Sequence, residues 1–195
     1  MKLTLGDTQL IIQEASKRGL LRNQLAYVLA TTYHETAHTM KPVREYGSEK
    51  YLKSKKYYPY VGRGYVQITW ETNYKKASIK LGVDFIKNPN LLMEPKYAAP
   101  ILLDGMIEGW FTGKKLSDYI TLQTSDFVNA RRIINGVDKK DLIAGYAKEY
   151  DSLLLEMGYG VKDTQKPVQE VSPPPATDTR PWWLKLLLAL IRGGK

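Results

Sequence analysis

The stretch YYPYVGRGYVQITW at residues 57–70 is the most distinctive part of the sequence, and it decides the fold that we expect. Glycines on both sides of Arg63 allow a tight turn. Beyond the turn, Gln67 and Thr69 alternate with apolar residues, so an extended segment would place the amide and the hydroxyl on one face. We expect that face to line a cleft while the other packs on a core. The tyrosines of this stretch would either stack on sugar rings or wall the core.

A second cluster, HETAH at residues 34–38, contains both histidines of the chain. On a helix, His34 and His38 would share one face with Glu35 as the general base, which is the HExxH pattern of zinc proteases. Catalytic zinc needs a third protein ligand, which here must be a glutamate. The available glutamates stand in no recognisable ligand motif: they are Glu45, Glu49, Glu71, Glu94 and Glu108. We therefore favour the simpler alternative, in which one histidine packs against its neighbours and the other binds a carboxylate.

Glu35 itself has two interpretations. It follows Leu29, Ala30 and Tyr33, so its surroundings are poor in water if this segment is helical. Desolvation favours the protonated form of a carboxyl group, which is the form that a glycosidase needs as its general acid. The alternative is a surface glutamate that pairs with a lysine or arginine.

Together these residues resemble the family 19 glycoside hydrolases, in the branch that contains bacteriophage endolysins. The matching motifs cover roughly residues 20–140: they are His34-Glu35-Thr36, GRGYVQIT at 62–69, Asn73-Tyr74 and Ile134-Asn135-Gly136. Tyr65 stands where plant chitinases of the family usually carry proline. The resemblance implies a mainly α, lysozyme-like domain of two lobes with a small irregular or β segment. It also implies a reaction without a metal or other cofactor, because the His-Glu of this family works without one.

The resemblance further implies an inverting reaction with two carboxyl groups. Glu35 matches the general acid, and Glu45 stands where phage members often carry the base, with Glu49 as the spare candidate. Thr69 matches the hydroxyl that positions the attacking water together with the base. Inverting enzymes hold the two carboxyl groups roughly 6.5–9.5 Å apart to leave room for that water.

Other positions match contacts with the substrate. Gln67, Tyr74 and Asn135 resemble residues of the family's cleft, and we place Tyr65 and Arg63 with them. Arg63 has the alternative role of buttressing its own loop. Two further arginines, Arg131 and Arg132, would either hold the helix against the carboxylates or face solvent.

The body of the chain is predicted to be helical. Apolar residues at three- and four-residue spacing and the positions of Gly and Pro predict helices at 7–18, 22–38, 71–82, 95–111, 125–134 and 138–157. Asp7 is the expected N-cap of the first helix and Gly19 its stop. The stretch 41–64 has little periodicity and is predicted to be a loop, followed by a short extended segment at 65–69.

Composition divides the chain into three parts. Residues 1–161 are the expected catalytic domain. Residues 162–181 contain five prolines, which is typical of an extended linker. The tail at 182–195 is WWLKLLLALIRGGK. As a helix, its apolar part would span about 15 Å, half of a ~30 Å bilayer core. We expect the tail to bind the surface of a membrane with anionic lipid, and the alternatives are packing on the domain or self-association.

Charge and composition limit the possible binding partners and substrates of the protein. The 195 residues carry a net charge of +9 and contain no cysteine, which excludes disulfides, thiolate metal sites and a cysteine nucleophile. A charge of this sign attracts polyanions, but no nucleic-acid recognition motif is present and we expect none bound. The basic charge and the lack of a Cys-rich chitin-binding module favour peptidoglycan over chitin. We expect a monomer.

We therefore expect an endolysin, a lysozyme-type N-acetylmuramidase that hydrolyses the β-1,4 bond of the host cell wall. The N-terminus lacks a continuous apolar stretch, so we expect synthesis in the host cytoplasm and action in the periplasm after holin-dependent release. The alternatives are a chitinase, a zinc peptidase, and a non-catalytic protein that binds the wall or the membrane.

Overall fold

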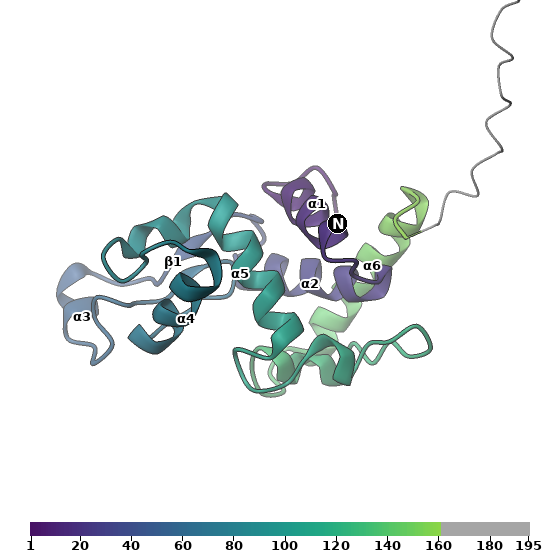
Figure 1. Cartoon of the computed structure of the whole chain (residues 1–195). Helices are drawn as coiled ribbons and strands as arrows, with labels where there is room; N and C mark the ends of the chain where they lie inside the picture. The colour runs from purple at the N-terminus through teal and green to yellow at the C-terminus, as the bar shows by residue number, and fades with distance from the viewer. Residues whose placement is uncertain (161–195) are drawn as a thin grey trace, which may run out of the picture. The chain divides into compact units, whose positions relative to one another are not determined.

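The computed structural model describes residues 1–160, and the predicted linker and tail lie outside these residues. Figure 1 shows the described part, whose elements in chain order are α1 (Thr8–Lys17), α2 (Arg22–Glu35), β1 (Val43–Arg44), α3 (Glu49–Lys53), β2 (Arg63–Gly64), α4 (Glu71–Leu81), η1 (Pro89–Met93), α5 (Pro95–Glu108), η2 (Leu116–Asp118), η3 (Asn129–Ile133) and α6 (Lys140–Glu156). The predicted mainly α class is confirmed.

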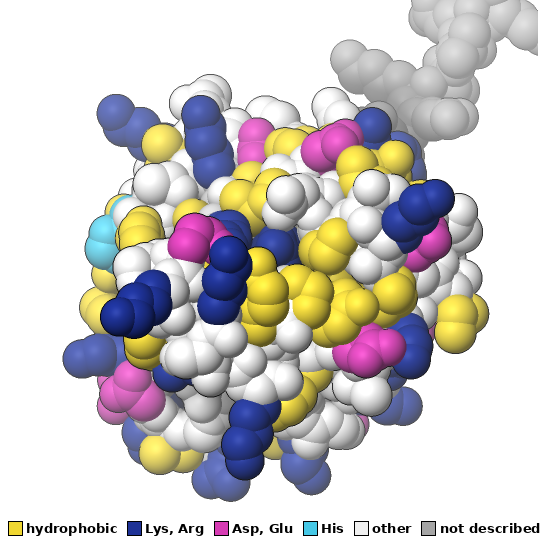
Figure 2. All heavy atoms as spheres, turned by 90° about the vertical axis from the view of Figure 1, so that its left-hand side faces the viewer, with side chains coloured by type: hydrophobic (Ala, Val, Ile, Leu, Met, Phe, Trp, Pro, Cys, Tyr) yellow, Lys and Arg dark blue, Asp and Glu magenta, His cyan; other side chains and the backbone are white. Residues whose placement is uncertain are grey.

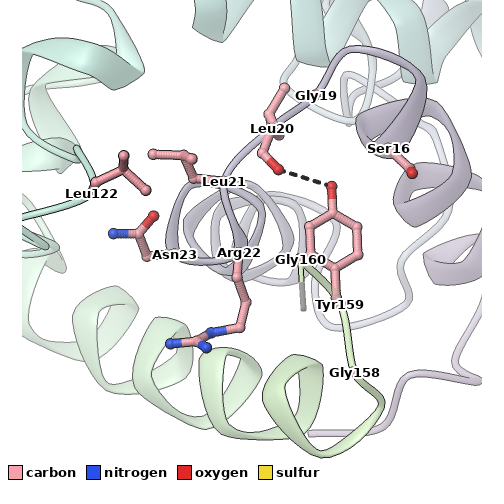
Figure 3. Close-up of a pocket in the computed structure, with 10 residues that line it drawn as sticks. All are labelled: Ser16, Gly19, Leu20, Leu21, Arg22, Asn23, Leu122, Gly158, Tyr159 and Gly160. Atoms are coloured by element: carbon pink, nitrogen blue, oxygen red, sulfur yellow. Dashed lines mark hydrogen bonds between the residues drawn. The ribbon is translucent and has the colours of Figure 1, made fainter. Parts of the chain in front are cut away.

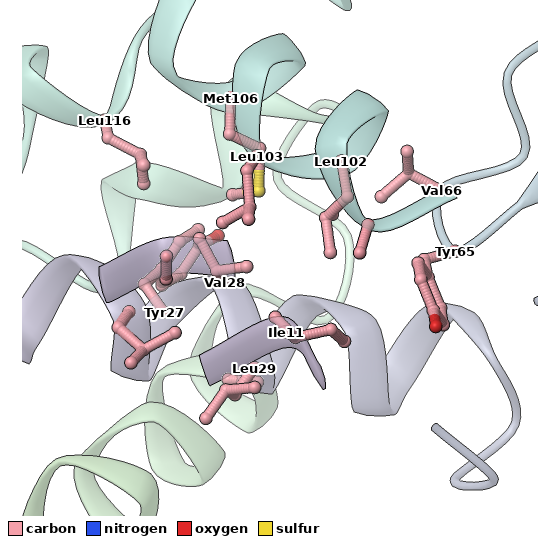
Figure 4. Packing of buried hydrophobic residues seen from close by; sticks show 14 of the residues in the cluster. Ile11, Tyr27, Val28, Leu29, Tyr65, Val66, Leu102, Leu103, Met106 and Leu116 are labelled. Carbon is pink, nitrogen blue, oxygen red and sulfur yellow. The ribbon is translucent and has the colours of Figure 1, made fainter. Parts of the chain in front are cut away.

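The core is built around α2. Every residue from 25 to 32 is buried, because this helix has neighbours on all sides rather than on one face. It packs most extensively along α6 and also contacts α1 and α5. Figure 4 shows Leu102, Leu103 and Met106 of α5 above Tyr27 and Val28 of α2, all of them buried. This central position fixes the end of α2, where Glu35 lies.

The GRG segment pairs with the loop that follows α2. In the antiparallel pair β1–β2, Val43 lies opposite Gly64 and Arg44 opposite Arg63. Figure 1 shows α3, β1 and α4 at one end of residues 1–160 and α1, α2 and α6 at the other, with α5 between. The pairing joins the segment after α2 to the GRG segment, which lies about 20 residues further along the chain. The expected cleft between two lobes stays a prediction.

The second predicted helix is too long, because α2 ends at Glu35 and not at residue 38. Ala37 and His38 both have positive φ, at 48° and 68°, which is incompatible with a right-handed helix. Thr36 stabilises the turn: its hydroxyl donates to Thr32 O at 2.7 Å and accepts from Met40 N at 3.0 Å. Local hydrogen bonding of this kind competes with helix continuation, and helical spacing alone does not reveal it.

Three other local predictions also differ. The predicted loop at 41–64 contains α3, which begins where Ser48 Oγ accepts a hydrogen bond from Tyr51 N at 3.2 Å. The segment 65–69 is not a strand, since Gln67 has φ +54°. The predicted alternation of burial is nevertheless present: Val66 and Ile68 are buried, whereas Gln67 and Thr69 are half-buried. The predicted helix at 125–134 is the short 3₁₀ helix η3.

The first helix begins and ends where the sequence predicted. Gly19 has φ +64° and follows the end of α1, a conformation that glycine adopts without strain. Asp7 precedes the helix, but its side chain makes no capping hydrogen bond. Asp7 Oδ2 instead accepts from the Tyr65 hydroxyl at 2.8 Å, which ties the GRG segment to the N-terminal helix.

Candidate active site

Glu35 is the last residue of α2, and its two carboxyl oxygens differ. Oε1 accepts a hydrogen bond from Arg131 Nη1 at 2.7 Å, and the side chains of Arg131 and Glu35 are 3% and 22% exposed. Arg131 is held a second time, through Nε, by Asp138 O at 3.0 Å. Within residues 1–160, Oε2 of Glu35 accepts no hydrogen bond, so no protein donor occupies this oxygen.

The two histidines do not form a zinc pair. His38 lies beyond the end of α2, and its ring stacks on Tyr33 with the centroids 4.4 Å apart. His34 is half-buried, and the loss of water lowers its pKa below the ordinary value despite the neighbouring Glu35. Among the described residues, no group of three or more His, Asp or Glu is placed to hold a metal ion. The shared helical face that HExxH requires is therefore missing.

Glu45 follows β1 and is fixed through both oxygens. Oε1 accepts from the Tyr57 hydroxyl at 2.6 Å and Oε2 from Gly62 N at 3.0 Å, while Glu45 N donates to Gly62 O at 2.8 Å. The hydrogen bond to Glu45 raises the pKa of Tyr57 to about 12, so Tyr57 remains a donor at neutral pH. The turn before the GRG segment thus fixes the orientation of this carboxylate.

Glu49, the spare candidate for the base, has a different environment. It is the first residue of α3, its side chain is 60% exposed, and it pairs with Arg44 Nη2 at 2.8 Å. Exposed ion pairs of this kind contribute at most about 1 kcal/mol to stability and do not fix a side chain. Because the Glu45 carboxylate is held at both oxygens and that of Glu49 is not, we favour Glu45 as the base.

Around Glu45 the polar residues of the GRG motif form a chain of hydrogen bonds. Gln67 Nε2 donates to Val43 O at 2.7 Å, Thr69 Oγ1 donates to Gln67 O at 2.8 Å, and Asn73 Nδ2 donates to Thr69 O at 2.8 Å. A Cβ on Gly62 would lie 2.7 Å from Gln67 Oε1, so a larger residue there would displace the Gln67 side chain. Thr69 therefore binds the backbone of the loop, and within residues 1–160 it makes no hydrogen bond to Glu45.

Three predicted substrate contacts are buried. Arg63, Tyr65 and Tyr74 are 5%, 1% and 0% exposed. Arg63 Nη1 donates to the Tyr74 hydroxyl at 2.7 Å and to Pro59 O at 3.0 Å, and the hydroxyl of Tyr74 donates to Val61 O. A role in binding substrate does not fit this burial. These side chains hold the loop together, which is the alternative that the sequence left open for Arg63.

Asn135 lies on the segment that carries the partner of Glu35. It is exposed, its backbone N–H donates to Arg131 O at 3.0 Å, and its Oδ1 accepts from Gly136 N at 2.8 Å. Of the two arginines, the buried Arg131 binds the carboxylate and the exposed Arg132 faces solvent, so each has one of the two roles that the sequence allowed.

The predicted residues thus fall into two groups. In the first group, Arg131 binds Glu35 through its side chain and Asn135 N through its backbone oxygen. In the second, Glu45 is bound to Gly62, in the same motif as Gln67 and Thr69. The sequence interpretation missed Tyr57 as the partner of Glu45. These residues lie 12 positions apart on a segment without periodicity, so no spacing rule links them.

Two cavities on the described surface differ in size and in the residues that line them. The larger, about 640 Å³, is shown in Figure 3, where the Tyr159 hydroxyl donates to Leu20 O at 3.1 Å. None of its ten lining residues is acidic: they are Ser16, Gly19, Leu20, Leu21, Arg22, Asn23, Leu122, Gly158, Tyr159 and Gly160. The second, about 550 Å³, is lined by Arg44, Glu49, Tyr58, Pro59, Arg63, Pro89 and Asn90. Neither includes Glu35 or Glu45, so the candidate site rests on the surroundings of these two carboxyl groups.

The comparisons with known proteins found partial similarity to proteins named as chitinases. No protein-family model matches the chain. Chitinase 8 of Oryza sativa subsp. japonica is 32% identical over 78 residues, which are 37% of this chain and 30% of the rice protein. Chitinase C of Streptomyces griseus aligns with a TM-score of 0.53 and 22% identity, covering 68% of this chain and 60% of that one. A chitinase C variant aligns with a TM-score of 0.41 and 20% identity, over 64% and 73% of the two chains.

The chain spans less than a third of the rice protein and three fifths of the Streptomyces protein. The endolysin branch that the motifs suggested is not represented among these relatives and stays a prediction. The described residues nevertheless have a mainly α fold, similar to that of chitinase C of Streptomyces griseus.

Proposed function

We propose that the protein is a glycoside hydrolase of the family 19 type, an endolysin that cleaves the β-1,4 bonds of peptidoglycan by an inverting acid and base mechanism. The observation that supports this most strongly is the asymmetric environment of Glu35. One oxygen is held by a buried arginine and the other has no protein partner among residues 1–160. A general acid needs this arrangement, in which the carboxyl group is oriented but its proton-bearing oxygen is accessible.

In the proposed reaction, Oε2 of Glu35 carries the proton and transfers it to the leaving glycosidic oxygen. Arg131 then stabilises the carboxylate that forms, because a charge-assisted hydrogen bond is stronger than a neutral one. The second hydrogen bond of Arg131, from Nε to Asp138 O, holds the guanidinium independently of Glu35.

Glu45 is the proposed base. Each of its oxygens accepts one hydrogen bond from the protein and keeps a lone pair that can accept a proton from water. The Thr69 hydroxyl donates to Gln67 O, so its remaining lone pairs can accept a second hydrogen bond from the same water. The water would then attack the sugar from the face opposite Glu35, which inverts the anomeric carbon. Both proton transfers use side chains of this chain, and we propose no cofactor.

Chitin is the second candidate substrate, favoured by the two named relatives, which are chitinases. The net charge of +9 favours peptidoglycan, whose peptides carry carboxylates. We expect more new reducing ends from purified peptidoglycan than from colloidal chitin at equal enzyme. The opposite preference would make the protein a chitinase.

Tyr57 is expected to act as a positioning residue for Glu45. The Tyr57→Phe variant loses the hydroxyl that binds Oε1, so the base is oriented less well, and kcat should fall about tenfold with little change in KM. Tyr58→Phe is the matched control, because Tyr58 is exposed and its hydroxyl binds no residue of 1–160. Equal losses in both variants, or an unchanged kcat in Tyr57→Phe, would remove Tyr57 from this role.

We also propose that residues 182–195, outside the described part, bind an anionic membrane surface, and that the enzyme reaches the periplasmic wall after holin-dependent release. In residues 1–160 no helix is both long and apolar enough to cross a membrane. A chain ending at Val161 should cleave isolated wall at a near-normal rate but bind anionic vesicles more weakly. Loss of wall cleavage by this truncated chain would show that the tail is needed by the domain.

A further inference from the structure

The segment around α3 concentrates positive charge. Residues 41–56 contain six Lys or Arg and only two Glu. We define the α3 surface as the five lysines of this segment together with the exposed aromatic residues beside them. The lysines are Lys41, Lys50, Lys53, Lys55 and Lys56, and the aromatic residues are Tyr46, Tyr51 and Trp70. Figure 2 views the side of the molecule with α3 and β1, and it shows a band of hydrophobic side chains with Lys and Arg around it.

The lysines of the α3 surface are not neutralised by the described protein. None of the five forms an ion pair with a carboxylate of residues 1–160, whereas Arg44 in the same segment pairs with Glu49. Lys50 and Lys53 lie one turn apart on α3, where like charges repel. Lys55 Nζ lies 4.0 Å above the ring of Tyr51. Positive charges gathered in this way repel one another and attract an anionic partner.

The aromatic residues connect this charge to the proposed base. Tyr46, Tyr51 and Trp70 are 83%, 47% and 51% exposed, although burial of aromatic rings is favourable. Trp70 has φ +75°, a conformation that bulky residues rarely adopt and that is often retained at functional sites. Its ring packs edge-on against Tyr57 with the centroids 5.2 Å apart, and Tyr57 holds Glu45. The α3 surface is therefore continuous with the surroundings of Glu45.

We propose that the α3 surface binds the acidic peptides of peptidoglycan while the glycan lies at Glu45, and that it makes the enzyme prefer peptidoglycan to chitin. This inference rests on the proposed function and adds a determinant of substrate choice to it. Both polymers contain β-1,4-linked N-acetylglucosamine, but only peptidoglycan carries peptide carboxylates. Lysines recognise those carboxylates, and exposed rings stack on sugars or peptide groups without distinguishing the two polymers.

The test compares two full-length variants that each lose three positive charges. The first combines Lys50→Gln, Lys53→Gln and Lys56→Gln on the α3 surface. The control combines Lys2→Gln, Lys87→Gln and Lys148→Gln, three exposed lysines that also lack ion pairs within residues 1–160. The substrates are purified peptidoglycan, the same material with its carboxylates converted to amides, and colloidal chitin.

At low salt we expect the α3 variant to lose about tenfold in kcat/KM on native peptidoglycan. Exposed charge contacts each contribute a factor of about 1.4 to 5, and three are removed. On amidated peptidoglycan and on chitin the α3 variant should match the unsubstituted chain, and the control should match it on all three substrates. Near 1 M salt, where the Debye length is about 3 Å, the difference on native peptidoglycan should nearly disappear.

Three results of the activity assays would overturn the proposal. They are an unchanged α3 variant on native peptidoglycan, an equal loss on chitin, and an equal loss in the control variant. Weaker binding to anionic vesicles with unchanged wall cleavage would assign the surface to lipid instead and would also overturn it.

Failure of the proposed function is distinguishable from these outcomes. In that case the unsubstituted chain releases no reducing ends from any substrate. Sedimentation with native and amidated peptidoglycan then tests the surface without catalysis. The inference requires about tenfold weaker binding by the α3 variant to native material alone, and equal binding by both variants would contradict it.

Discussion

Glu35→Gln is expected to lower hydrolysis of peptidoglycan by at least about 10²-fold, which is the lower end of what general acid catalysis contributes. Glutamine keeps the shape of the side chain and can still accept the hydrogen bond from Arg131 Nη1, now 2.7 Å from Oε1. It lacks the acidic proton that the leaving oxygen needs. Initial rates of reducing-end release measure the effect.

The control for this variant is Glu149→Gln, which removes an exposed carboxylate that pairs only with the N-terminal amine within residues 1–160. It should retain full activity. Circular dichroism and the thermal midpoint should show that the Glu35→Gln protein is folded. Near-normal wall lysis by the folded Glu35→Gln protein would remove Glu35 from the mechanism.

Glu45→Gln should have an effect of similar size, about 10²-fold or more in kcat, because the attacking water loses its base. Glu49→Gln should stay within about twofold, since Glu49 forms an exposed pair with Arg44. Thr69→Val should add little when combined with Glu45→Gln, because both groups act on one water and such effects are not additive.

The pair Glu45→Gln and Glu49→Gln is the sharpest test of the base. The two residues lie four positions apart, and both substitutions remove one negative charge from the same short segment. A harmless Glu45→Gln combined with an inactive Glu49→Gln would show that the wrong glutamate has been assigned.

Much of the fold was predictable because its signals are local. Apolar spacing identified α1, α4, α5 and α6, and alternation around Gln67 gave the correct burial even though the backbone there is not a strand. The premature end of α2 was not predictable from apolar spacing. It depends on the hydroxyl of Thr36, which binds the backbone on both sides of the turn.

The candidate site was predicted less completely, because its decisive contacts are distant in sequence. Motif resemblance singled out Glu35 and Glu45, but for Arg131 and Arg132 the sequence left two roles open, because Arg131 lies 96 positions from Glu35 and no local pattern links them. The motif also suggested that Tyr65 and Tyr74 contact substrate. Their burial depends on packing against α1 and on the hydrogen bonds of Arg63, neither of which a motif records.

The most direct test of the central claim is mass analysis of the products released from purified peptidoglycan after chemical reduction of new reducing ends. We predict soluble disaccharide-peptides whose reduced sugar is N-acetylmuramic acid, and their absence from the Glu35→Gln digest. Free peptides released from intact glycan strands, or an absence of soluble products from native wall, would contradict cleavage of the glycosidic bond by this protein.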